Sequence, residues 1–264
     1  MQSFQLNGAK LNIFPNIDEL SHSLAKHFAS LAKNAVKEKG LFAVSLAGGS
    51  TPKSLYRLLA TPPYCNDVPW QQTHVFFGDE RCVPLNNPHS NCGMVQEMVL
   101  SKVAIPEPNI HAPYLDNDPR QAASTYDRLL QSFFGLAKRQ LPIFDLVLLG
   151  LGKDGHTASL FPGTTALKEK SHLFIAVYIE SLKSYRLTMT LPVINSAANV
   201  IFMVTGSDKN DILAQVLTAT PHTLPAQFVS PTKGSLEWYV DNHAVANLDP
   251  NLLVGMPGNI ARFT

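Results

Sequence analysis

The sequence predicts an α/β fold: a doubly wound, mostly parallel sheet with helices on both faces, Rossmann-like, with a small additional C-terminal subregion. Short apolar runs alternate with amphipathic segments along most of the chain, which is typical of strands that alternate with crossover helices. Several of these runs end in glycine-containing or charged segments, where an α/β sheet binds its ligands. We expect one domain over residues 1–264, because no internal repeat or low-complexity linker interrupts the chain.

The composition is that of a globular enzyme. The chain has 264 residues, of which 45% are hydrophobic and 16% charged, so it can bury a large core. A formal net charge of +1 gives no general basic field, and no apolar run approaches the ~18 residues of a membrane span, so neither nucleic acid nor membrane is an expected partner. Cys65, Cys82 and Cys92 lack a metal-ligand spacing, which favours reduced thiols and a cytoplasmic protein.

The first elements follow from periodicity and capping signals. Residues 17–39 carry apolar side chains at gaps of three and four, which predicts an amphipathic helix. Asn16 followed by Glu19 resembles a capping box, and Gly40 marks the end of the helix. The apolar run at residues 41–46 then predicts a strand.

That strand ends in the segment Ala47-Gly-Gly-Ser-Thr-Pro52, where Thr51 is suited to cap a new helix with proline at its first position. Gly48 and Gly49 leave backbone N–H groups open to a ligand, and Ser50 adds a hydroxyl. The dipole of the following helix favours a negative charge at the same place. The segment is therefore either a phosphate-binding loop or an ordinary tight turn.

A second buried strand is predicted at residues 73–77, and the segment Gly78-Asp-Glu-Arg-Cys82 follows it. Arg81 is suited to clamp a phosphate, and Asp79 to hold a sugar hydroxyl or orient a base. The alternative is a solvated turn with a surface ion pair. Ser90 is suited to cap the next helix, which is expected to run to about residue 102.

The remaining chain continues the alternation. Residues 104–119 are rich in proline and asparagine and predict a long connection, and residues 121–138 predict a helix. Further strands are expected at residues 144–149, 173–179, 186–191, 200–204 and 236–240. Shorter helices are expected at residues 192–198, 210–217 and 243–248.

The strand at residues 144–149 leads into Gly150-Leu-Gly-Lys-Asp-Gly155 and then His156, where a new helix is expected to begin. The glycines match the dinucleotide pattern G-x-G-x-x-G, which also requires an acidic residue about 20 positions on, at the end of a strand. Glu169 lies near that distance but in a polar stretch, and a histidine directly after the third glycine is ill suited to close helix packing. The sequence therefore does not favour a nicotinamide cofactor.

His156 is the candidate general base. The ordinary pKa of histidine, about 6.5, suits proton transfer at neutral pH. Because parallel strands end at the same edge of a sheet, we expect the glycine segment, Asp79, Arg81 and Lys209 to meet near this histidine. Arg186, at the start of a predicted strand, is a further cation. A histidine among cations and glycines indicates a phosphorylated substrate that needs a general base.

Taken together, the motifs resemble those of the 6-phosphogluconolactonases, in the glucosamine/galactosamine-6-phosphate isomerase superfamily. The resemblance covers about residues 15–250 and rests on Ala47-Gly-Gly-Ser-Thr-Pro52, Gly78-Asp-Glu-Arg81 with Ser90-Asn91, Gly150-Leu-Gly-Lys-Asp-Gly-His-Thr-Ala-Ser159 and Gly206-Ser-Asp-Lys209. In the related deaminases/isomerases the Asp-Gly-His core continues Ile-Ala-Phe-Asn-Glu-Pro. Here Leu160-Phe161 replaces the Asn-Glu pair, which favours the lactonase.

The resemblance implies hydrolysis of 6-phospho-D-glucono-1,5-lactone to 6-phospho-D-gluconate in the oxidative pentose phosphate pathway, without metal or cofactor. His156 would activate water, with backbone N–H groups of residues 150–156 as candidate oxyanion donors and Asp79 holding hydroxyls or tuning the histidine. The residues expected to hold the phosphate are Gly48, Gly49, Ser50, Arg81, Arg186 and Lys209. A glucosamine-6-phosphate deaminase/isomerase and a non-catalytic sugar-phosphate-binding module remain alternatives. A monomer and a homodimer are both compatible with the sequence.

Overall fold

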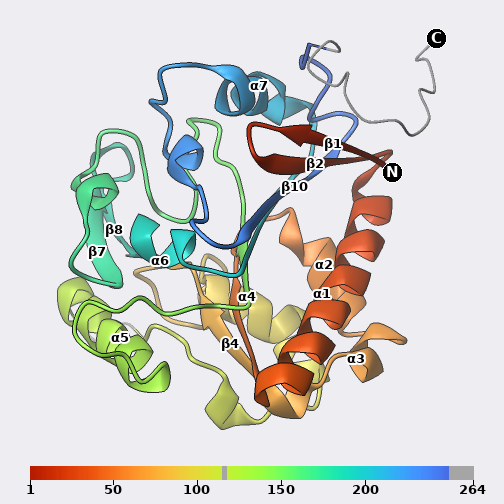
Figure 1. The fold of residues 1–264 in the computed structure, drawn as a ribbon. Helices are drawn as coiled ribbons and strands as arrows, with labels where there is room; N and C mark the ends of the chain where they lie inside the picture. Colours follow the sequence, from red (N-terminus) through yellow and green to blue (C-terminus); the bar gives the residue numbers. More distant parts are fainter. Residues whose placement is uncertain (115–117, 250–264) are drawn as a thin grey trace.

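A seven-stranded sheet forms the centre of the molecule, in the strand order β1-β2-β10-β9-β6-β3-β4. The computed structural model describes residues 1–114 and 118–249, and Figure 1 shows this sheet among its helices. In that order the strands are β1 (Gln2–Leu6), β2 (Ala9–Phe14), β10 (Ser235–Asp241), β9 (Asn199–Val204), β6 (Leu146–Leu149), β3 (Phe42–Leu46) and β4 (Thr73–Phe77). Neighbours pair in parallel except β1 and β2. The predicted mostly parallel sheet is confirmed.

Helices cover both faces of this sheet because its inner strands are apolar on both sides. Leu146 and Leu148 of β6 join one buried cluster, whereas Val147 and Leu149 join the other. The helices are α1 (Ile17–Lys39), α2 (Pro52–Leu59), α3 (Tyr64–Asp67), α4 (Asn91–Met98), α5 (Pro119–Phe133), α6 (Leu191–Asn195) and α7 (Asn210–Thr218). The first cluster takes side chains from α1, α2 and α4, and the second from α5, α6 and α7.

Short 3₁₀ helices fill several of the connections. They span Trp70–Gln72, Leu100–Lys102, Glu107–Asn109, Thr165–Lys168, Glu180–Leu182, Ser207–Lys209 and Pro225–Phe228. Within residues 1–114 and 118–249, none of the helices combines the length and apolar character that a membrane crossing requires.

A second, three-stranded antiparallel sheet is the main departure from the expected fold. It has the order β5 (Asp79–Arg81), β8 (Ser184–Met189), β7 (Phe174–Ile179). The sequence predicted a charged ligand-binding segment at residues 78–82, with a solvated turn as the alternative, and placed the other two strands in the mostly parallel sheet. A parallel pair needs a crossover of about a dozen residues or more, whereas the short Glu180–Leu182 helix and Lys183 join β7 to β8. The connection therefore forms a hairpin.

The two ends of the chain also differ from expectation. The antiparallel hairpin of β1 and β2 was not predicted, and β2 pairs in parallel with β10. β10 lies between β2 and β9 inside the main sheet, not in a separate C-terminal subregion. Residues 243–248 form turns rather than the expected helix, where the Asp241 carboxylate accepts a hydrogen bond from the Ala244 N–H at 2.8 Å. Residues 250–264 lie outside the described part.

Most local capping signals hold. The Asn16 side chain accepts a hydrogen bond from the Glu19 N–H at 2.9 Å, and Gly40 ends α1 with φ 83°. Ser90 caps α4, accepting from the Gly93 N–H at 3.0 Å. Thr51 precedes α2 as expected, but its φ of −59° and ψ of −47° are helical and its side chain makes no capping bond.

Three predicted helices end early, and one of them is α6, which stops at Asn195 rather than at residue 198. α5 stops at Phe133 rather than at residue 138, because the chain turns at Gly135, whose φ is 58°. α4 ends at Met98, and a 3₁₀ turn at Leu100–Lys102 replaces the expected last turn.

Candidate active site

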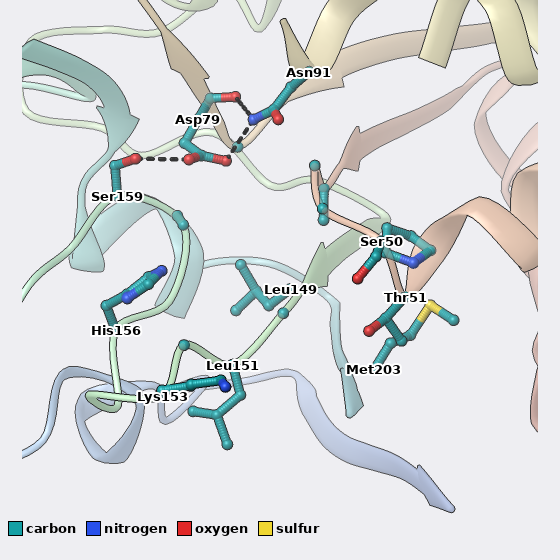
Figure 2. Close-up of a pocket in the computed structure, with 18 of the residues that line it drawn as sticks. Ser50, Thr51, Asp79, Asn91, Leu149, Leu151, Lys153, His156, Ser159 and Met203 are labelled. Carbon is teal, nitrogen blue, oxygen red and sulfur yellow. Dashed lines mark hydrogen bonds between the residues drawn. The ribbon is translucent and has the colours of Figure 1, made fainter. Parts of the chain in front are cut away.

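The candidate site lies where the chain order of the strands reverses. From β3 the chain continues to β4 at the edge of the sheet, and from β6, on the other side of β3, it continues to β9. The loops after β3 and β6 therefore diverge and leave a crevice at the carboxyl ends of the strands, where α/β sheets bind ligands. A pocket of about 620 Å³ occupies this position (Figure 2).

All the site residues expected from the sequence border this one pocket. They are Gly48, Gly49, Ser50, Asp79, Arg81, His156, Arg186 and Lys209. Figure 2 shows Ser50 and Thr51 on one side of the pocket and His156 and Ser159 on the other. The walls come from the C-terminal ends of β3, β4, β6 and β9 and from the small sheet, which confirms that these strand ends converge.

His156 stands in a tight turn rather than at the start of a helix. The Gly152 N–H donates to the His156 carbonyl at 2.8 Å, and the Gly155 N–H donates to the Gly152 carbonyl at 3.1 Å. Residues 157–163 continue as turns with a bridge between Thr157 and Leu160. The expected helix N-terminus at His156 is therefore wrong, and no helix dipole acts there.

The glycine pattern of residues 150–155 serves this turn. A Cβ on Gly152 would lie 2.1 Å from His156 Nδ1, so any side chain there would displace the imidazole. Gly155 has φ 78°, and a Cβ there would press against Leu224 at 2.9 Å. The match to the dinucleotide pattern thus has a local cause, which is the packing of a histidine turn.

Asp154 is the acidic partner of His156. The Asp154 Oδ1 lies 2.5 Å from His156 Nδ1 and also accepts from the His156 N–H at 3.1 Å. A carboxylate acceptor at Nδ1 selects the tautomer that carries its proton there and leaves Nε2 as a base. Burial raises the pKa of Asp154, but the charge and N–H groups of His156 outweigh it and hold that pKa below its ordinary value.

Asp79 faces a different set of partners. Its Oδ2 accepts from the Ser159 hydroxyl at 2.6 Å, and its Oδ1 accepts from the Asn91 amide at 3.1 Å (Figure 2). Asn91 also donates to the Asp79 carbonyl at 2.9 Å. Burial raises the pKa of Asp79, against the lowering effects of the Ser159 hydrogen bond and the Arg81 charge. The direct partner of the histidine is therefore Asp154 and not Asp79.

Two arginines lie side by side on neighbouring strands of the small sheet. Arg81 of β5 and Arg186 of β8 are Cα partners in the antiparallel register, so their side chains project from the same face. Arg81 Nη1 donates to the His89 carbonyl at 2.6 Å, and Arg186 Nη1 donates to the Ser184 hydroxyl at 3.0 Å. Burial, followed by the charge of Arg81, lowers the pKa of Arg186. Two adjacent like charges at a pocket wall favour binding of an anion.

The glycine loop after β3 presents backbone donors. Within the described part of the chain, the N–H groups of Gly48, Gly49 and Ser50 donate to no protein acceptor. Gly49 has φ 95° and an open surrounding, so it is free for close approach of a ligand. Lys209 reaches the pocket after β9, and its Nζ donates to the Leu151 carbonyl at 2.8 Å. Together these donors form a second place for negative charge.

One known protein family matches most of this chain. A family model described as "Glucosamine-6-phosphate isomerases/6-phosphogluconolactonase" matches residues 15–238. The chain belongs to this family.

Members of the isomerase/lactonase family are similar to this chain, in sequence and in fold, over most of its length. A protein of Nostoc called 6-phosphogluconolactonase is 44% identical over 217 residues, which cover 81% of this chain and 88% of the relative. A crystal structure titled devB protein is 34% identical, with a TM-score of 0.83 over 90% of this chain and 99% of the other. The 6-phosphogluconolactonase of Trypanosoma cruzi is 29% identical, with a TM-score of 0.82 over 93% and 98%.

Several residues of this isomerase/lactonase site were not singled out from the sequence. Asp154 directly precedes the glycine before His156, and only the closed turn shows that its carboxylate reaches back to the ring. Ser159 and Asn91 stand within the family motifs, but their contact with Asp79 joins segments far apart in the chain. The sequence motifs contain these residues but do not indicate which side chains they contact in the folded protein.

Phe161 also borders the pocket, and its ring stacks on the His156 imidazole, with ring centroids 4.0 Å apart and an interplanar angle of 22°. Phe161 is 9% exposed and its neighbour Leu160 is fully buried. The position that carries a glutamate in the deaminase motif therefore presents a phenyl ring to the imidazole in this chain. Within the described residues, no three His, Cys, Asp or Glu side chains converge as metal ligands.

Proposed function

We propose that this chain hydrolyses 6-phospho-D-glucono-1,5-lactone to 6-phospho-D-gluconate, a step of the oxidative pentose phosphate pathway. The observation that carries the proposal is the His156 imidazole at the pocket wall, paired with Asp154 at 2.5 Å and stacked on Phe161. This arrangement suits a neutral base that activates water. The Nostoc and Trypanosoma cruzi relatives, both called 6-phosphogluconolactonase, support the same activity.

The hydrolysis needs one proton to move twice. His156 Nε2 takes a proton from water as the oxygen attacks C1 of the lactone, and the Asp154 carboxylate stabilises the imidazolium that forms. The C1–O bond of the ring then breaks, and the departing ring oxygen takes the proton from Nε2. A positioned base of this kind accelerates a reaction by roughly 10²–10⁴-fold. That is sufficient for an activated ester, and the new carboxyl group then loses its proton to solvent, which gives 6-phosphogluconate.

The oxyanion at C1 needs N–H donors about 3 Å away. In the loop at residues 150–156, the N–H groups of Gly152, Gly155 and His156 already donate within the turn. The remaining candidates in this loop are the N–H groups of Gly150, Leu151, Lys153 and Asp154. We therefore narrow the oxyanion donors to these.

The phosphate would lie among the cations and the free N–H groups described above. They belong to Gly48, Gly49, Ser50, Arg81, Arg186 and Lys209, which surround one pocket. For Asp79 we propose contact with sugar hydroxyls, since its carboxylate is oriented by Ser159 and Asn91 and does not hold the imidazole.

A deaminase/isomerase is the competing activity within the family. Proton transfer in ring opening of an amino sugar is helped by a second carboxylate near the histidine, and Phe161 occupies that place in this chain. Release of ammonia from glucosamine-6-phosphate would favour this alternative. A non-catalytic sugar-phosphate-binding module would not require the Asp154–His156 pair.

Acid release from freshly prepared 6-phosphogluconolactone tests the proposal, with wild type, His156→Ala and His172→Ala compared at one pH. His172 is the matched control, because its side chain is 61% exposed and pairs with Glu169 away from the pocket. We expect acceleration by wild type and His172→Ala, and a loss of about 10²-fold or more in His156→Ala. A wild-type rate equal to the spontaneous rate would reject the lactonase.

We also propose that the chain acts as one domain, because its pocket draws on residues from Ala47 to Lys209. A cytoplasmic location fits its free cysteines, Cys65, Cys82 and Cys92. The proposed partner is a small-molecule sugar phosphate. Because residues of a single chain line the pocket, a monomer and a homodimer are both compatible with the activity.

A further inference from the structure

The His156 imidazole is confined by more than its bond to Asp154. Its ring stacks on Phe161, with centroids 4.0 Å apart, and Gly152 packs so closely that a Cβ would approach Nδ1 to 2.1 Å and Cε1 to 2.2 Å. A single hydrogen bond at Nδ1 leaves the ring free to pivot about that contact. Neighbours against its carbon and nitrogen atoms restrict this motion, and Figure 2 shows the ring extending into the pocket.

Phe161 is itself held in place. Its carbonyl accepts from the Thr164 hydroxyl at 2.8 Å, which closes the turn that follows it. Earlier in the segment, the Thr157 hydroxyl donates to the Gly150 carbonyl at 2.9 Å, and the Ser159 N–H donates to the Thr188 hydroxyl at 3.2 Å. The segment at residues 157–164 is thus anchored to the end of β6 and to the small sheet. Because this backbone is anchored and the Phe161 side chain is only 9% exposed, its phenyl ring has little room to move away from the imidazole.

We infer that Phe161 is a positioning residue for the proposed reaction: its ring keeps the His156 imidazole in the orientation that presents Nε2 to water at C1. This inference rests on the proposed role of His156 as the base. A ring face is also favourable for the imidazolium formed when Nε2 takes up its proton, because the π electrons attract a cation. Phe161 thereby acts in the step where charge develops, and not in substrate binding.

The geometry separates this role from ordinary core packing. The charged groups that line the same pocket are Asp79, Arg81, Lys153, Asp154, Arg186 and Lys209. Phe161 contributes no charge or hydrogen bond among them, so its truncation should leave phosphate binding in place. Its effect should appear in kcat, whereas loss of a phosphate ligand should appear in KM.

The test compares Phe161→Leu with Phe161→Tyr, and with Phe144→Leu as a control in the same apolar cluster. Phe144 is fully buried and packs on Phe76 and Phe134 at the opposite end of β6. We expect Phe161→Leu to lower kcat about tenfold while KM stays within about twofold. Phe161→Tyr retains the ring and should recover most of the loss. Phe144→Leu should lower thermal stability without lowering kcat of the folded enzyme.

A spectroscopic measurement is independent of turnover. The stacked phenyl ring shifts the proton resonances of the His156 imidazole upfield, and His156→Asn identifies them in the spectrum. The shift should disappear in Phe161→Leu and persist in Phe161→Tyr and Phe144→Leu. If Phe161→Leu does not fold, Phe161→Met, which preserves the volume without the ring, takes its place.

Two kinetic outcomes would overturn the inference: an unchanged kcat in Phe161→Leu, or equal losses of kcat in the Leu and Tyr variants. Retention of the imidazole shift in Phe161→Leu would overturn it as well. Failure of the proposed function gives a different result, since wild type itself would then lack lactonase activity while the imidazole resonances still report the stacking.

Discussion

At the scale of single residues, the Asp154–His156 pair decides which nitrogen carries a proton. Asp154 Oδ1 is 2.5 Å from Nδ1, and the Asp154 side chain is 48% exposed. Water therefore shares in solvating this carboxylate, which makes its contribution smaller than that of a fully buried aspartate in a catalytic triad. The pair still fixes the tautomer, because a carboxylate only accepts.

Asp154→Asn should lower kcat about 10²-fold and leave KM within about twofold. An asparagine amide can donate to Nδ1, which would place the imidazole proton on Nε2 and remove the base. Steady-state kinetics on the lactone measures both constants. Asp208→Asn is the control, since Asp208 is 51% exposed and pairs with Lys153. A wild-type kcat in Asp154→Asn would show that His156 does not depend on this partner.

Gly48 is required for space rather than for an unusual backbone angle. A Cβ at Gly48 would lie 1.8 Å from Asn91 Oδ1 and 2.1 Å from its Cγ. Asn91 is 1% exposed and orients Asp79, so it has no room to yield without breaking that contact. The glycine loop and the Asp79 carboxylate are thereby coupled through one buried amide.

Gly48→Ala should lower kcat/KM at least tenfold and reduce the thermal midpoint, because displacing a packed buried side chain typically costs about 1–3 kcal/mol. A double-mutant cycle with Asn91→Ala checks the cause, since the shorter side chain makes room for the new methyl group. The two losses should then be strongly non-additive. Additive losses would show that Gly48 acts on the substrate alone.

Arg81→Ala should raise KM for the phosphorylated lactone by about tenfold or more, because a charge-assisted contact to phosphate is lost. Unphosphorylated glucono-1,5-lactone should be hydrolysed equally by wild type and variant, which isolates the phosphate contribution. Arg57→Ala on the exposed face of α2 is the matched control. An unchanged KM for the phosphorylated substrate would reject the assignment.

At the scale of elements, a buried carboxylate joins β5 to α4. Glu80 is 1% exposed and accepts hydrogen bonds from the N–H groups of Arg81, Asn91 and Cys92, each at 2.7 Å. The Ser90 hydroxyl donates to the same carboxylate at 2.9 Å. Negative charge at a helix N-terminus is favourable, so Glu80 both caps α4 and fixes the strand that carries Arg81.

Glu80→Gln should lower the free energy of unfolding by roughly 2–4 kcal/mol, since the neutral amide loses charge-assisted bonds and brings buried donors of its own. Urea unfolding measures this loss, and Glu97→Gln on the exposed face of α4 is the control. KM should rise in the folded Glu80→Gln variant, because both Arg81 and Asn91 shift. Equal stability of the two variants would contradict this account.

The element scale is also where prediction from the sequence was least complete. Short continuous apolar runs correctly indicated β3, β4, β6 and β9, because strands that are buried on both faces need apolar side chains at every position. The same pattern does not state which neighbour a strand pairs with. β7 and β8 look like the other strands in sequence, and only their short connection and their packing on α5 assign them to a separate sheet.

At the scale of the whole molecule, a histidine pair outside the pocket makes stability depend on pH. His74 Nδ1 and His111 Nε2 are 3.1 Å apart beside β4, and His111 stacks on Phe76 with centroids 4.3 Å apart. Burial lowers the pKa of both, and burial together with His74 lowers the pKa of His111 to about 4. The folded protein thus keeps His111 neutral where the unfolded chain is already protonated.

Stability should therefore fall as the pH drops from about 6.5, where the unfolded histidine takes up its proton, to about 4, where the folded one does. The expected loss from this residue is on the order of 2 kcal/mol, below the full effect of the shift because His111 is partly exposed. Urea unfolding at pH 7.5 and 5 measures it. His111→Phe should flatten the dependence relative to wild type and to the exposed control His222→Ala; an equal slope in all three would contradict it.

The sequence by itself determined the alternating strands and helices, the glycine and charged segments at strand ends, and the convergence of His156, Arg81 and Lys209 at one edge. These follow from local rules, since apolar periodicity reports burial and parallel strands end together. Only the tertiary structure decided that β10 enters the middle of the sheet and that Phe161 stacks on His156. Those features depend on packing between segments distant in the chain, which no local pattern encodes.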